Sequence, residues 1–369
     1  MINKDRVINT FFEYIKIDSE TLNEGEMAQK LIEDMRSLGM EVWTDNAGEK
    51  IGSNGNNVYG YLKGDLNLEP LLFSAHMDTV KPGINIEPVI KNDTIYSSGN
   101  TILGGDDKSG IVGIIEALKV IKEKNLSHGP IEVVFTICEE GGLKGSKSLE
   151  YDKLKSKRAF VLDSGGDVGK VVVKAPAQDK IIAKIKGRSA HAGVAPEEGI
   201  SAIQVAAEAI VNMKLLRIDE ETTANIGMIK GGVATNIVCP EVEIVAEARS
   251  ISNEKLKLQT AHMVDALNKA IEKFGADIEL EVTHSYDAVN IEEGDEILKI
   301  TKAACERVGV EFVTASTGGG SDANVLNGNG IKAVTLGTGM SKVHTVEEFI
   351  TIENLLNTAK LTLEIMLRN

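Results

Sequence analysis

The first forty residues of the chain carry apolar side chains at helical spacing. Val7 and Phe11 recur on one face, and Met27 and Leu31 recur on another. The pattern predicts two amphipathic helices between residues 5 and 40. A strand is expected to start directly afterwards, at Glu41.

Short apolar runs then alternate with helical patterns. The expected strands cover residues 58–62, 71–75, 131–137 and 159–163, with a helix over 109–124 and a helical turn around Ser146. Alternation of strands and helices is typical of an α/β domain, so we predict a parallel-type sheet flanked by helices.

The order of predicted strands and helices changes at about residue 178. Strands are predicted over 181–186, 223–229, 242–249 and 278–284, and helices over 200–214 and 253–274. This β-α-β-β-α-β order is that of a ferredoxin-like sandwich, whose first and last strands lie close together, as an inserted domain requires.

The α/β pattern returns after the insertion. It predicts a helix over 296–308, a strand over 333–336 and a helix over 352–367. We therefore expect a discontinuous catalytic domain of residues 1–177 and 286–369, interrupted by a domain of residues 178–285. The overall prediction is an α/β fold with a mixed sheet flanked by helices and a ferredoxin-like insertion.

Composition excludes several classes of partner. The 369 residues are 42% hydrophobic, which is enough for two cores. A formal charge of −15 argues against a nucleic-acid or anionic-membrane partner. The three cysteines lie far apart, the N-terminus has no signal segment, and no apolar run reaches the roughly 20 residues of a membrane span. We expect a cytoplasmic protein.

Three short motifs carry candidate chemistry, each at the end of an apolar run or at a helix entrance. In His76-Met-Asp78 the spacing of two puts both side chains on one face of an extended segment, so Asp78 can orient the imidazole of His76 on a metal. Alone, the tripeptide more often indicates a surface histidine beside a turn carboxylate.

The second motif is Gly-Gly-Asp106-Asp107, at the entrance of a helix. A carboxylate on such a tight turn could bridge two cations, although helix N-capping is the commoner use of the sequence. The third is Glu139-Glu140, after an apolar strand. Adjacent side chains diverge, so one carboxylate can bind a metal while the other faces the metal-bound water; alone, the pair would indicate a solvated loop.

Asp163 ends an apolar strand, and His344 follows a Gly-rich loop. Each is a single residue, and single residues of these types are more often structural. Together with the three motifs they complete a set of oxygen and nitrogen ligands for two metal ions. The set is His76, Asp106, Glu140, Asp163 and His344, with one carboxylate shared.

The chain resembles the M20 metallopeptidase family, and within it the tripeptidase T-like branch. The matching stretches are Ser-Ala-His76-Met-Asp78-Thr-Val, Ile-Leu-Gly-Gly-Asp106-Asp-Lys-Ser-Gly, Glu139-Glu140-Gly-Gly-Leu-Lys-Gly-Ser, Val-Leu-Asp163-Ser-Gly, Gly-Arg-Ser-Ala-His191-Ala-Gly and Val-His344-Thr-Val-Glu-Glu-Phe. They span nearly the whole chain in the order of the family.

The resemblance implies a role for each of these residues. His76 and Asp163 would bind one zinc ion, Glu140 and His344 the other, and Asp106 would bridge the two. Asp78 would orient His76, Glu139 would be the general base, and the peptide bond between Asp106 and Asp107 would be cis.

The resemblance also implies that the inserted domain is a lid and dimerisation domain. His191 would reach the site of the partner subunit and help to stabilise the oxyanion, while Asn236 and Arg249 would hold a substrate carboxylate. Three glycines would let the backbone approach the substrate, namely Gly318, Gly319 and Gly320.

The predicted function is hydrolysis of short peptides, with release of the N-terminal residue of tripeptides by a metal-bridging water that Glu139 activates. We expect a homodimer formed through the lid and two Zn²⁺ per subunit, with Co²⁺ or Mn²⁺ also compatible with the ligands. One alternative is an M20 deacylase or carboxypeptidase acting on N-acyl amino acids or dipeptides. A remote alternative is a non-catalytic metal-binding scaffold. Tripeptidase T proper is somewhat longer, so strict tripeptide preference stays open.

Overall fold

The computed structural model describes residues 1–367 and divides into two compact units. Unit 1 comprises residues 1–173, 291–317 and the chain from 321 onward, and unit 2 comprises residues 174–290 and 318–320. The boundaries fall a few residues outside those expected from the sequence, and residues 318–320, which we expected in the catalytic domain, group with unit 2 instead. Residues 368 and 369, which the expected catalytic domain includes, lie outside the described residues.

The larger sheet is mixed and has the strand order β1-β2-β6-β3-β7-β16-β8-β14, and β15 pairs beside β8. It belongs to unit 1, except for β14 and the last two residues of β8, which belong to unit 2. The strands are β1 (Glu41–Thr44), β2 (Val58–Leu62), β3 (Leu71–His76), β6 (Ile131–Thr136), β7 (Arg158–Ser164), β8 (Lys170–Ala175), β14 (Val289–Asn290), β15 (Val313–Ser316) and β16 (Lys332–Gly337). The mixed sheet that we predicted is confirmed.

Only the centre of this sheet is parallel. Strands β6, β3, β7 and β16 run parallel to one another, whereas β1, β2, β8 and β14 pair antiparallel to their neighbours. The expectation of a parallel-type sheet was therefore wrong for the flanking strands. The connection from β7 to β8 is too short for a crossover helix, so β8 returns antiparallel.

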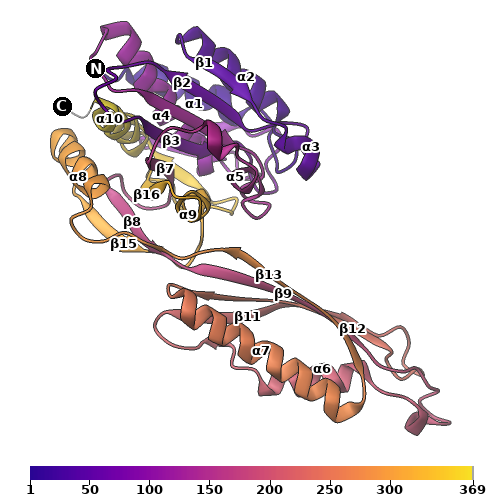
Figure 1. The fold of residues 1–369 in the computed structure, drawn as a ribbon. Coiled ribbons are helices and arrows are strands. Elements are labelled where there is room, and N and C mark those ends of the chain that lie inside the picture. Colours follow the sequence, from indigo (N-terminus) through magenta and orange to yellow (C-terminus); the bar gives the residue numbers. More distant parts are fainter. Residues whose placement is uncertain (368–369) are drawn as a thin grey trace. The chain divides into compact units, whose positions relative to one another are not determined.

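Helices cover both faces of the sheet (Figure 1). They are α1 (Lys4–Ile15), α2 (Gly25–Ser37), α3 (Ala47–Ile51), α4 (Gly105–Lys124), α5 (Lys144–Lys147), α8 (Glu296–Val308), α9 (Asp322–Gly328) and α10 (Ile352–Leu367). Helix α4 packs against β3, β7, α1 and α10, which explains why it is buried on nearly all sides. The Asp106-Asp107 motif at its N-terminus is thus held by a helix that its neighbours enclose.

Unit 1 also contains a small three-stranded sheet that we did not predict. It joins β4 (Pro88–Lys91), β5 (Thr94–Ser97) and β17 (Phe349–Thr351) in the order β17-β5-β4. Asn92 and Asp93 form the two-residue turn between β4 and β5 with φ of 49° and 55°. Turns of this kind favour Asn and Asp, so the hairpin did have a signal in the sequence.

Unit 2 has the expected ferredoxin-like arrangement. Its antiparallel sheet has the order β10-β11-β12-β9-β13, and its two long helices lie on one face (Figure 1). The elements are β9 (Ala177–Lys186), α6 (Ala202–Asn212), β10 (Leu216–Arg217), β11 (Thr222–Gly231), β12 (Glu241–Ser250), α7 (Asn253–Phe274) and β13 (Asp277–Tyr286). Across both units, no described helix combines the length and apolar character that a membrane crossing needs.

Candidate metal centre

The candidate ligands of unit 1 gather at one edge of its sheet. His76 ends β3, Glu140 follows β6, and Asp163 lies at the end of β7. These three strands are neighbours and run parallel, so their carboxyl ends meet at the same edge, where α/β sheets place their sites. His344 follows β16, the next parallel strand, and Asp106 lies at the N-terminus of α4.

Asp106 lies between two pairs of candidate ligands. Its Oδ1 is 2.9 Å from His76 Nε2, and that nitrogen is 3.8 Å from Asp163 Oδ1. Its Oδ2 is 3.3 Å from His344 Nε2, which is 2.7 Å from Glu140 Oε1. One carboxylate thus faces both imidazoles, which is the geometry that a ligand shared by two cations needs.

Asp78 lies beside the second ring nitrogen of His76, with its carbonyl oxygen closer than its carboxylate. His76 Nδ1 lies 2.8 Å from the carbonyl oxygen of Asp78 and 3.5 Å from its carboxylate. The carboxylate also accepts hydrogen bonds from Thr21 Oγ1 and from the N–H groups of Glu139 and Glu140. Asp78 therefore approaches His76 Nδ1 with both its carbonyl oxygen and its carboxylate, and its carboxylate also holds the Glu139-Glu140 turn.

The turn that carries Asp106 leaves helical geometry. Asp106 has φ of −84° and ψ of 102°, and its peptide bond to Asp107 is cis, as the resemblance implied. Asp107 had no expected role in metal binding. Its carboxylate accepts from the N–H groups of His76 (3.3 Å) and Gly110 (3.2 Å), and it can also approach His76 and Asp163 closely enough to share a cation with them.

Several buried carboxyl groups of the cluster lie close together, and this crowding changes their pKa values. Burial, reinforced by the negative charge of neighbouring carboxylates, raises the pKa of Asp163, Asp107 and Glu139 well above their ordinary values. Hydrogen bonds to Asp106 and Glu140 raise the pKa of His344 to about 10. Burial disfavours the charged form of Asp106, but its hydrogen bonds with the two histidines outweigh that effect and lower its pKa.

The raised pKa values reflect the crowding of carboxyl groups, and a positive charge among them would favour their ionised forms. The donors are carboxylate oxygens and imidazole nitrogens, which suit divalent cations such as Zn²⁺. His76, Asp106 and Glu140 each offer a ligand atom within 4.8 Å of the others. The residues therefore fit a metal site.

A buried lysine next to the cluster escaped our sequence reasoning. Lys108 Nζ donates to Ser19 Oγ (2.7 Å) and to the carbonyl oxygen of Met77 (3.0 Å), and burial lowers its pKa to about 8. The Met77 carbonyl lies between His76 and Asp78, so Lys108 supports the backbone of the first motif. The sequence did offer a signal, because Lys108 is a charged residue in the first turn of a largely apolar helix.

The three residues expected in the lid, His191, Asn236 and Arg249, all belong to unit 2. Their hydrogen-bond partners differ. His191 is exposed and its Nδ1 accepts from the N–H of Gly193, while the backbone oxygen of Asn236 accepts from the N–H of Ala192. Arg249 makes two hydrogen bonds to Glu247, of 2.8 and 3.1 Å. A substrate carboxylate would therefore have to compete with Glu247 for this guanidinium group.

The expected glycine loop also belongs to unit 2. A Cβ atom added to Gly318 or Gly319 would meet no atom within 4 Å, so the fold itself does not require glycine at these two positions. A Cβ at Gly320 would come closer than 3.0 Å to the ring of Tyr286, so glycine is needed there to admit the ring. Arg249 Nη1 donates to the carbonyl oxygen of Gly318 at 3.2 Å.

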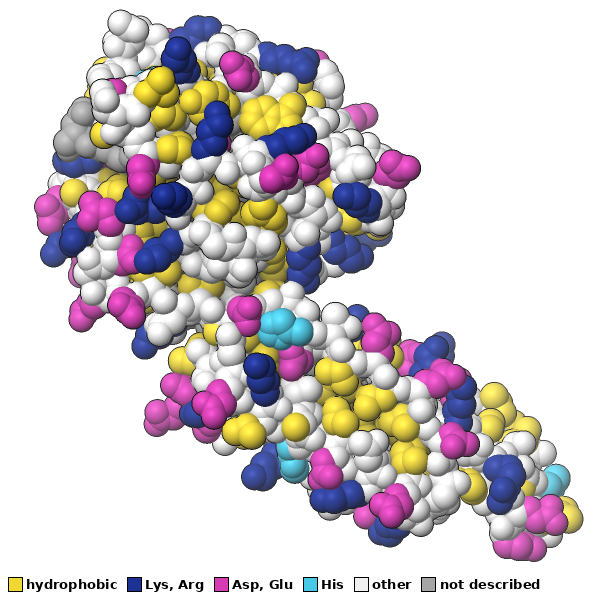
Figure 2. All heavy atoms as spheres, viewed as in Figure 1, with side chains coloured by type: hydrophobic (Ala, Val, Ile, Leu, Met, Phe, Trp, Pro, Cys, Tyr) yellow, Lys and Arg dark blue, Asp and Glu magenta, His cyan; other side chains and the backbone are white. Residues whose placement is uncertain are grey.

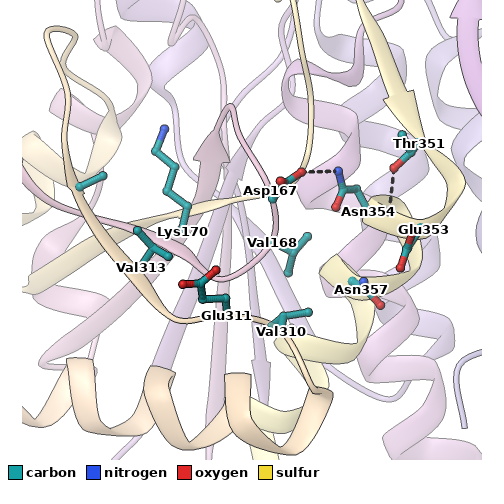
Figure 3. Close-up of a pocket in the computed structure, with 11 residues that line it drawn as sticks. Asp167, Val168, Lys170, Val310, Glu311, Val313, Thr351, Glu353, Asn354 and Asn357 are labelled. Atoms are coloured by element: carbon teal, nitrogen blue, oxygen red, sulfur yellow. Dashed lines mark hydrogen bonds between the residues drawn. The ribbon is translucent and has the colours of Figure 1, made fainter.

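A separate pocket of about 580 Å³ in unit 1 contains none of the expected site residues (Figure 3). Val168, Val310 and Val313 form part of its wall, together with the first turn of α10. In Figure 3 the amide of Asn354 points toward Asp167, to which it donates a hydrogen bond of 3.1 Å. This bond ties α10 to the loop that follows Asp163.

Comparisons with known proteins agree with this geometry. The family model described as peptidase family M20/M25/M40 matches residues 72–368. An uncharacterised protein of Bacillus subtilis, YqjE, is 43% identical over 366 residues, which are 99% of each chain.

Two solved structures are similar along the whole chain. One is described as the aminopeptidase PepT from Bacillus cereus, with 44% identity, a TM-score of 0.92, and coverage of 100% of this chain and 99% of that one. The other is described as a tripeptidase from Staphylococcus aureus, with 43% identity, a TM-score of 0.95, and coverage of 100% and 98%. Because the family model matches most of its length, the chain belongs to the M20 peptidase family and is a hydrolase of peptide bonds.

Proposed function

We propose that the protein is an aminopeptidase that releases the N-terminal residue of tripeptides and similar short peptides, using two metal ions. The position of Asp106 between the His76–Asp163 pair and the His344–Glu140 pair carries this proposal. His76 and Asp163 would hold one ion, Glu140 and His344 the other, and Asp106 both. Zn²⁺ suits these ligands best, and Co²⁺ or Mn²⁺ can replace it.

Bound metal ions would supply Lewis acidity, which lowers the pKa of water and polarises the scissile carbonyl. Glu139 would take the proton of the attacking water and deliver it to the leaving amine. Its raised pKa suits a group that must both accept and release a proton near neutral pH. Asp78 would keep Glu139 in place, because its carboxylate accepts the N–H of that residue at 2.9 Å.

Unit 2 would act as the lid and as the dimer interface. We propose that His191 of a second subunit stabilises the oxyanion, and that Asn236 and Arg249 bind the substrate carboxylate, with Gly318, Gly319 and Gly320 leaving room for its backbone. For Arg249 this requires release of Glu247 on binding.

Exposed apolar side chains of unit 2 support association with a second copy. Ile203 and Val211 of α6 and Leu258 of α7 are 52%, 77% and 66% exposed. Figure 2 shows apolar side chains gathered between charged ones on this part of the surface. Burial of such side chains would favour a dimer. Light scattering of the purified protein is expected to give twice the mass of one chain; the mass of a single chain would contradict the dimer.

A series of peptides of increasing length tests the reaction. We expect the metal-loaded protein to cleave tripeptides with a free N-terminus faster than dipeptides or longer peptides, and to release the N-terminal residue. The control is the same series with acetylated N-termini, which should be poor substrates because an aminopeptidase recognises the free amine. Preference for the acetylated series would favour the deacylase alternative.

A further inference from the structure

One buried carboxylate of unit 1 has no role in the proposed reaction. Glu348 is only 1% exposed and accepts three backbone hydrogen bonds from one turn. Its Oε2 accepts from the N–H groups of Leu103 (2.8 Å) and Gly104 (2.9 Å), and its Oε1 accepts from the N–H of Asp106 (3.0 Å). Charge-assisted bonds of this kind are stronger than neutral ones, so the carboxylate holds the turn firmly.

The turn is shaped to receive this carboxylate. Gly104 has φ of +73°, a left-handed conformation that favours glycine. A Cβ atom at Gly105 would lie 3.0 Å from Glu348 Oε1, so only glycine leaves the carboxylate its full space. The Gly-Gly sequence before Asp106 therefore has a second purpose besides the tight turn.

Glu348 belongs to the same loop as His344. The N–H and carbonyl groups of Ser341 and Phe349 pair with each other at 3.0 Å, which closes residues 341–349 into a loop. His344 lies within this loop, and Glu348 lies at its base. His344 Nε2 reaches Asp106 Oδ2, while Glu348 binds the backbone N–H of the same aspartate.

We propose that Glu348 is a positioning residue that sets the distance between Asp106 and His344 and thereby the affinity for the metal ion that His344 and Glu140 hold. The inference rests on the proposed metal ligands. The two ligand-bearing segments are 238 positions apart in the sequence, and Glu348 connects them through three hydrogen bonds. Groups that orient metal ligands in this way contribute strongly to metal affinity.

Glu348→Gln tests the proposal. The amide oxygen can keep two of the three N–H groups, but its NH₂ then faces the third, so the turn loosens without a large change in volume. We expect titration calorimetry with Zn²⁺ alone to show one site weakened roughly 10- to 100-fold and the other changed little. Peptidase activity should return when excess Zn²⁺ is added. Glu347→Gln is the matched control, because Glu347 is exposed and pairs with Lys342.

The outcomes separate this inference from the proposed function. If the unaltered protein binds no metal, the proposed metal site itself is wrong. If that protein binds two ions and Glu348→Gln binds both equally well, only the positioning role is wrong, even if the variant unfolds at a lower temperature. Should Glu348→Gln not fold, Gly105→Ala replaces it, since the added methyl group crowds Oε1. A smaller weakening of one site is then expected, and unchanged binding of both ions would overturn the proposal.

Discussion

Glu139→Gln is expected to lower kcat on a tripeptide by about 10²- to 10⁴-fold while both metal ions stay bound. An amide cannot take the proton of the attacking water, but it preserves the size of the side chain. The carboxylate that lies 2.7 Å from His344 belongs to Glu140 and not to Glu139, so the substitution should leave the metal ligands unchanged. Steady-state kinetics of the metal-loaded variant, together with its metal content, measure both parts of this expectation.

Glu140→Gln provides the matched control at the neighbouring position. It should lose metal affinity, because an amide is a weaker ligand than a carboxylate, and excess metal should restore part of its activity. Glu139→Gln should not respond to excess metal. If Glu139→Gln instead lost a metal ion or kept its turnover, the roles that we assign to the two glutamates would be wrong.

Removal of the metal ions should destabilise the protein, and more so at high pH. Asp163, Asp107 and Glu139 have pKa values raised well above those of the unfolded chain, so the metal-free folded state binds protons more tightly than the unfolded state. Stability from these groups is present at low pH and is lost as pH rises from ~4 toward the raised values. The contribution of His344 follows the same direction and is lost between ~6.5 and its raised value of about 10.

Thermal unfolding with and without a chelator measures this effect. The chelated protein should be more stable at about pH 5.5 than at about pH 8, whereas the metal-loaded protein should lose little over the same range because the ions neutralise the carboxylates. The control is addition of excess Zn²⁺ to the chelated sample, which should restore the midpoint. Equal midpoints with and without chelator at the higher pH would contradict a metal site in this cluster.

Three helices could be predicted to the residue, and two of them have clear caps. The helices over 253–274, 296–308 and 352–367 have the expected bounds. The first begins after Ser252, which accepts the N–H of Lys255, and ends at Gly275 with φ of 64°. A helix cap involves residues only a few positions apart, so it can be recognised from the sequence alone.

Features that depend on distant residues could not be predicted. The short β17 has only three residues, and its strand character comes from pairing with β5, more than 250 positions earlier. Sequence reasoning could find His76, Glu140 and Asp163 because each lies at or just after the end of an apolar strand, and Asp106 because it lies at a helix entrance. The partners of Glu348 depend on the folded chain.

The order of the central sheet has a consequence for synthesis of the protein. Strand β16 lies between β7 and β8, although it is made more than 150 residues after them. A nascent chain that has not yet reached β16 therefore exposes the edges of two apolar strands and lacks His344. Unit 2 is complete earlier, apart from residues 318–320, and its contacts can form on the ribosome. Unit 1 can complete its central sheet only after the C-terminal part of the chain has been made, and until then its unpaired strand edges are open to pairing with other chains.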